Sequence, residues 1–112
     1  MRSDNFMSET NREKFEARAR IMKALGHASR LIMVDELSRG ERCVCELREL
    51  VGTDLSTVSK HLSILKDAGI VEYDKRGVQV FYRLKVPCIL NFFHCVEAVL
   101  ESQAREAERV AR

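Results

Sequence analysis

The spacing of apolar residues changes along the 112-residue chain, and this change limits the fold more than any other feature. Up to Gly69 apolar residues recur every three or four positions, which is typical of amphipathic helices. From Ile70 to Asp74 and from Val78 to Leu84 they favour strands, joined at Lys75-Arg76-Gly77. After Pro87 the helical spacing returns. The sequence therefore predicts a mainly α-helical fold with one β-hairpin.

Four helices are predicted before residue 70, from possible caps and apolar stripes. The first begins at about Asn11, and the second follows an N-cap at Ser29. The third begins near Cys45 and ends at Gly52, and Asp54 is a suitable N-cap for the fourth. The residues expected to face the core from the third and fourth helices are Leu47, Leu50, Val51, Val58, Leu62 and Leu65.

Two short helices separated by Gly52-Thr53 and followed by a hairpin form the pattern of a winged helix-turn-helix. In that fold the second helix lies in the major groove of DNA. Because Val58 and Leu62 must face the core, the other side of this helix is open to DNA. Small hydroxyls there permit close approach, and Lys60 can neutralise a phosphate or bind a guanine. The expected DNA contacts are Ser56, Thr57, Ser59, Lys60 and Ser63.

Two further side chains leave alternatives open. Arg76, in the predicted hairpin tip, could enter the minor groove, lie on the DNA backbone or remain an ordinary exposed residue. His61 could be partly buried beside Leu62 or contact a phosphate.

The formal net charge is only +2. Affinity for double-stranded DNA must therefore come from local clusters of charge and from dimerisation.

The length and patterning predict one domain. We expect a flexible N-terminal tail over 1–10, a DNA-binding and dimerisation domain over 11–105, and a charged C-terminal tail over 106–112. No apolar stretch approaches the roughly 18 residues of a membrane span, and residues 1–10 lack the apolar core of a signal peptide. We therefore expect a cytoplasmic protein without membrane contact, whose cysteines stay reduced.

The last predicted helix carries a large apolar stripe for a terminal helix. Its members are Ile89, Phe92, Phe93, Val96, Val99 and Leu100. The stripe could pack on the core of its own chain. A two-fold interface between terminal helices is favoured, because contiguous exposed apolar surface usually marks a partner. The sequence thus predicts a homodimer.

Cys43 and Cys45 lie two positions apart at the start of the third helix. In a helix such residues point about 200° apart, whereas in an extended segment they share a face. Convergence of both sulfurs on one ion would therefore compete with the start of the helix. We expect this to shift the DNA-contacting helix that follows.

Thiolates select soft ions, and two of them are too few for a closed zinc site. The pair suits a low-coordinate ligand such as trivalent arsenic or antimony. Cys88 could supply a third ligand, whereas Cys95, on the apolar stripe, is expected to be a buried small residue. Two alternatives remain: idle thiols, and a redox sensor that releases DNA on oxidation.

Two segments together carry a resemblance to a known family. Cys43-Val44-Cys45-Glu46-Leu47 and the run from Ser56 to Val71 closely resemble ArsR/SmtB-type metal-sensing repressors, in particular the arsenic-responsive branch. The resemblance implies a homodimer that binds an imperfect inverted repeat and is released by its inducer. The arsenic branch often has another Cys where this chain has Arg48. The zinc-type ligand positions fall on Val86, Val99 and Ser102, which cannot bind zinc.

No enzyme motif is found: the chain has no Gly-rich phosphate loop and no metalloprotease motif. We therefore expect a non-enzymatic repressor without a catalytic cofactor, released from its operator by trivalent arsenic or antimony at Cys43 and Cys45. The alternative function is a repressor of the same fold that responds to thiol oxidation, cadmium or lead. A winged helix that binds a protein rather than DNA is a further alternative.

Overall fold

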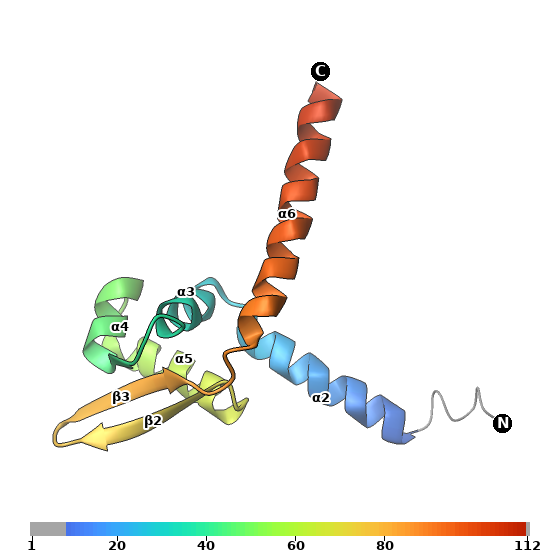
Figure 1. Cartoon of the computed structure of the whole chain (residues 1–112). Helices are drawn as coiled ribbons and strands as arrows, with labels where there is room; N and C mark the ends of the chain where they lie inside the picture. The colour runs from blue at the N-terminus through green and yellow to red at the C-terminus, as the bar shows by residue number, and fades with distance from the viewer. Residues whose placement is uncertain (1–8, 112) are drawn as a thin grey trace.

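The computed structural model describes residues 9–111, which form five helices and a three-stranded antiparallel sheet (Figure 1). The elements are α2 (Glu9–Leu25), α3 (Ala28–Leu37), β1 (Arg42–Cys43), α4 (Val44–Val51), α5 (Leu55–Asp67), β2 (Val71–Arg76), β3 (Gln79–Leu84) and α6 (Ile89–Ala111). The order matches the predicted mainly helical fold with one hairpin. Residues 1–8 of the expected N-terminal tail lie outside the described residues. Among the described helices, none has the length and apolar character of a membrane span.

The core lies between α3, α4, α5 and the strands. Leu47, Val58, Leu62 and Leu65 are fully buried, as their spacing predicts. Leu50 is 46% exposed, so the prediction that it faces the core is wrong. The eight-residue helix α4 covers the core with only the narrow stripe that contains Leu47, and Leu50 lies beside this stripe.

Local capping fixes the boundaries around the helix-turn-helix. Gly52 has a left-handed conformation (φ 78°) and caps the C-terminus of α4 by donating its N–H to Arg48 O at 2.9 Å. Asp54 caps the N-terminus of α5 by accepting the Thr57 N–H at 2.9 Å. Both caps confirm the prediction. The cap of α3 differs from the prediction, because the N-cap is His27, whose Nδ1 accepts the N–H of Ser29 at 3.1 Å.

The sheet has the order β1-β3-β2, and the β2–β3 hairpin forms the wing. Arg76 pairs with Gln79, which leaves Gly77 and Val78 as the two-residue turn. Gly77 has a positive φ of 64°, as such turns require, and Val78 is 99% exposed. The turn therefore lies one residue later than predicted, and Val78 belongs to the tip instead of the strand.

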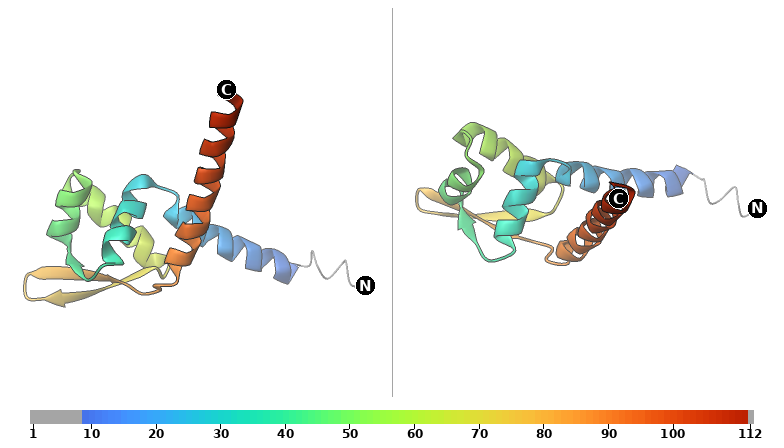
Figure 2. Two further views of the ribbon diagram at one scale, coloured as in Figure 1. Left: turned by 45° about the horizontal axis from the view of Figure 1, so that its top comes forward. Right: turned by 90° about the horizontal axis from the view of Figure 1, so that it is seen from above.

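The two terminal helices extend away from the compact part of the chain. In Figure 2 the free ends of α2 and α6 project in different directions, while the C-terminal end of α2 lies near the start of α6. The helix α6 continues to Ala111, so most of the segment expected as a charged tail forms its last turns. Every residue of α6 is exposed or half-buried in this chain.

Candidate DNA interface and thiol site

The outer side of α5 presents four of the five side chains predicted to contact DNA. Ser56, Ser59, Lys60 and Ser63 are exposed and lie opposite the buried stripe of this helix. Thr57 is half-buried at the edge of that side, where its backbone N–H binds Asp54. An α-helix with its side chains is about 10–12 Å across, which suits a major groove about 12 Å wide, and the 13 residues of α5 extend over about 20 Å.

His61 ties the inner side of α5 to two other helices. It is buried, and its Nδ1 accepts a hydrogen bond from Arg30 Nε at 3.1 Å. Arg30 also donates to Ala24 O, at the C-terminal end of α2, at 3.1 Å. The His27 ring lies 4.4 Å from the His61 ring. Of the two alternatives for His61, the structure shows the buried one, and the residue fixes the placement of α5.

The surroundings of His61 favour its neutral form. Burial lowers the pKa of His61 below its ordinary value, and the nearby His27, Arg30 and Lys60 lower it further. A protonated Nδ1 could not accept the Arg30 hydrogen bond, so the contact requires the neutral imidazole.

Arg76 lies at the end of β2, next to the wing tip, and its guanidinium is held by acidic residues. Its two terminal nitrogens bind the Glu41 carboxylate at 2.8 and 2.7 Å, and its Nε binds Asp74 at 3.1 Å. The guanidinium also lies over the Phe81 ring, 4.7 Å from the centroid. The hydrogen bond from Arg76 lowers the pKa of Glu41, so this pair stays ionised near neutral pH. Arg76 is therefore engaged by other residues of the chain.

The thiol pair lies across the start of α4. Cys43 is the N-cap residue in an extended conformation (φ −81°, ψ 161°) and is 8% exposed, whereas Cys45 lies in the first turn and is exposed. Glu46 accepts the Cys43 N–H at 2.9 Å, and this hydrogen bond lowers the pKa of Glu46. The predicted junction between an extended segment and a helix therefore lies between the two thiols.

Within residues 9–111 no three His, Cys, Asp or Glu side chains are grouped closely enough to hold a metal ion. The two thiols can supply two soft ligands, and the described part of one chain does not bring Cys88 or another such residue to them. Cys88 and Cys95 are both exposed free thiols. The expectation that Cys95 is buried is therefore wrong for a single chain, because none of the described residues covers that side of α6.

An apolar groove of about 540 Å³ separates α2 from the first half of α6. Met22, Leu25 and Leu31 line one side of it, and Phe92 and Val96 line the other. Phe92 is 41% exposed, and Val96, Val99 and Leu100 are exposed as well. This surface is the one that the sequence predicts to be covered by a partner.

The comparison with known proteins agrees with this architecture. Residues 27–73 match the family described as bacterial regulatory protein, arsR family. The biofilm growth-associated repressor of Xylella fastidiosa (strain Temecula1 / ATCC 700964) is 35% identical over 108 residues, which cover 90% of this chain and 95% of the relative. The chain belongs to the arsR family.

Two further comparisons also cover most of the chain. The HTH-type transcriptional repressor SmtB of Mycobacterium tuberculosis is 33% identical over 103 residues, which cover 92% of this chain and 72% of SmtB. The homodimeric winged helix-turn-helix DNA-binding domain Mb0332 of Mycobacterium bovis, a possible ArsR-family regulator, superimposes with a TM-score of 0.75. It is 30% identical, and the match covers 89% of this chain and 93% of that domain. The winged helix-turn-helix fold predicted from the sequence is thus confirmed.

Two residues were not predicted from the sequence: Glu41, which holds Arg76 beside the wing tip, and Arg30, which binds His61 on the inner side of α5. Glu41 lies 35 positions before Arg76, and Arg30 lies 31 positions before His61. Both contacts join residues that are distant in the chain and belong to no periodic pattern. The charged composition of the wing was the only signal for the first contact.

Proposed function

We propose that this arsR-family member is a homodimeric repressor that binds double-stranded DNA through the outer side of α5. Support comes from the exposed Ser56, Ser59, Lys60 and Ser63 on a helix that is firmly seated by its buried stripe. Hydroxyls and a single lysine suit contacts to phosphates and base edges. Thr57 contributes less, because its side chain is half-buried at the edge of this side. An inverted-repeat operator suits a two-fold dimer.

The partner that covers the α2–α6 groove in this proposal is a second copy of the chain. The groove and the apolar residues beside it form one continuous surface on the two terminal helices. A homodimeric relative of known structure covers nearly all of the same fold. Dimerisation would place two α5 helices on one face, as binding to two half-sites requires.

The inducer in this proposal is trivalent arsenic or antimony bound by Cys43 and Cys45. The observation that carries it is the location of the two thiols on either side of the residue where α4 begins, Val44. Each As–S bond replaces an As–OH bond, and the thiol proton leaves with the hydroxide as water. Cys43 is extended and Cys45 lies in the first helical turn, so the pair is intermediate between an extended segment, where i and i+2 side chains share a face, and a helix, where they diverge by about 200°. We expect that bringing both sulfurs to one arsenic extends this segment and opens the first turn of α4.

Opening this turn would break the hydrogen bond between Glu46 and the Cys43 N–H. A helix cap of this kind is worth about 1 kcal/mol. The core contact of α4 through Leu47 adjoins α5, so a displaced α4 disturbs the seat of the DNA-binding helix. Coupling between two sites in proteins typically amounts to a 5- to 150-fold change in affinity, and we expect release within about this range.

The test is a titration of the protein–operator complex with arsenite and antimonite, on an operator selected from random duplexes. Cys43→Ser with Cys45→Ser should bind the operator normally, because Ser is among the best N-caps, and should no longer be released. Cys88→Ser with Cys95→Ser is the matched control and should be released like the wild type. Normal release from the first variant would reject the thiol proposal. Release by cadmium, lead or peroxide alone would replace arsenic with the heavy-metal or redox alternative.

A further inference from the structure

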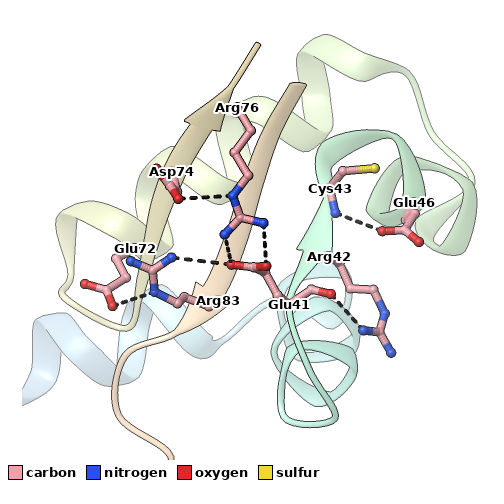
Figure 3. A network of polar contacts seen from close by, with 8 residues as sticks. All are labelled: Glu41, Arg42, Cys43, Glu46, Glu72, Asp74, Arg76 and Arg83. Atoms are coloured by element: carbon pink, nitrogen blue, oxygen red, sulfur yellow. Dashed lines mark hydrogen bonds and ion pairs between the residues drawn. The ribbon is translucent and has the colours of Figure 1, made fainter. Parts of the chain in front are cut away.

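A row of alternating charges crosses the outer face of the sheet (Figure 3). The Glu41 carboxylate lies between two arginines and binds Arg76 at 2.7 and 2.8 Å and Arg83 at 3.4 Å. Arg83 in turn binds Glu72 on β2 at 2.9 Å. Both terminal nitrogens of Arg76 are used by Glu41, which is the same two-point geometry that a guanidinium offers to a phosphate.

Glu41 is the member of this row that lies next to the thiol site. It directly precedes β1 and is two residues from Cys43. The β1–β3 pairing places Cys43 opposite Phe81, and the Phe81 ring lies beneath the Arg76 guanidinium. Asp74 and Glu72 belong to β2 and therefore move with the wing itself. Glu41 alone among the three carboxylates connects the wing to the segment that carries Cys43.

We propose that Glu41 is a positioning residue that couples the state of the thiol pair to the orientation of Arg76 on the wing. The inference rests on the proposed function, in which Cys43 and Cys45 bind the inducer and the wing lies on DNA. Opening the first turn of α4 changes the backbone at Cys43 and thereby displaces Glu41, two residues away. Arg76 then loses its two-point partner and changes orientation relative to the DNA backbone.

The first experiment compares inducer-dependent release in wild type, Glu41→Gln and Asp74→Asn. Both variants remove one carboxylate that binds Arg76, so both remove one negative charge beside this guanidinium. Only Glu41→Gln breaks the link to β1. The ratio of operator Kd with and without arsenite should fall at least about fivefold in Glu41→Gln and stay within about twofold of wild type in Asp74→Asn. Equal ratios well above one in all three proteins would overturn the inference and leave the proposed inducer intact.

The second experiment needs neither DNA nor arsenite. In a Cys88→Ser/Cys95→Ser background, Cys43 and Cys45 are the only thiols. One equivalent of mercuric ion then binds there, and NMR follows the Arg76 Nε–Hε signal, assigned by its loss in Arg76→Lys. The signal should shift in this background and in its Asp74→Asn variant, and should not shift in its Glu41→Gln variant.

The two experiments separate the possible failures. An Arg76 signal that mercury leaves unchanged, or that shifts equally in Glu41→Gln, would overturn the coupling through Glu41. If arsenite fails to release the operator while mercury still moves Arg76 through Glu41, the coupling stands and the proposed inducer is wrong.

Discussion

Replacement of Lys60 by Ala tests how α5 meets DNA. Lys60 is exposed on the outer side of α5, and a dimer presents two copies of it. If each copy neutralises one phosphate, the variant loses about two counterion-releasing contacts. Each contact contributes about 0.9 to the slope of the logarithm of the association constant against the logarithm of the salt concentration. Loss of two contacts should therefore make this slope less steep by about 1.8. At about 0.1 M salt this corresponds to a roughly 60-fold weaker Kd, or about 2.5 kcal/mol.

The assay is fluorescence anisotropy of a labelled operator over a series of potassium chloride concentrations. Lys66→Ala is the matched control, because Lys66 belongs to the same helix but its ammonium lies over the Tyr73 ring, 5.4 Å from the centroid. This control should keep the wild-type slope. An unchanged slope in Lys60→Ala, or equal changes in both variants, would refute the phosphate contact. Loss of affinity confined to one operator base pair would show that Lys60 binds a base.

Two further predictions concern the seat of α5 and the dimer. The pKa of His61 is lower in the folded protein than its ordinary value of 6.5. The neutral imidazole therefore stabilises the fold above about pH 6.5, and this stabilisation is lost as the pH falls from there towards the pKa of the folded protein. The free energy of unfolding in urea should therefore fall between about pH 7.5 and about pH 5.5, and it should fall less in His61→Gln, which can accept from Arg30 without titrating. Phe92→Glu should weaken the dimer by about 1–3 kcal/mol, since a partner would bury the 41% of each Phe92 that one chain leaves exposed, twice per dimer. Sedimentation equilibrium measures this change against Asn91→Glu, which lies off the apolar stripe, and equal dimer stability in the two variants would contradict the interface.

The parts of the fold that local chemistry determines could be predicted from the sequence. Asp54 and Gly52 act on backbone groups within a few residues of themselves, so their roles as caps follow from residue type and position. The buried stripe of Val58, Leu62 and Leu65 follows from helical periodicity alone. The same is true of the side of α5 that faces away from the core. Helical periodicity therefore suffices to outline the surface that we propose for DNA.

The contacts that control the site could not be predicted in this way. The partners of Arg76 and His61 come from segments more than 30 residues away, and their pairing depends on strand register and helix packing. A shift of the hairpin turn by one residue moved Val78 from a strand to the tip, which periodicity cannot resolve. The exposure of Cys95 and of the α6 stripe depends on which segments pack against α6, which helical periodicity does not specify.

The small size of α4 explains why two thiols could be enough to control DNA binding. A helix of eight residues is marginal by itself and depends on its cap and on the burial of Leu47. Coordination by Cys43 and Cys45 would act on its first turn, where about 1 kcal/mol of capping is at stake. The opposing free energy is therefore small, whereas the affected helix is one of the supports of α5. A soft ion with only two protein ligands would need to supply little binding energy to move the DNA-contacting surface.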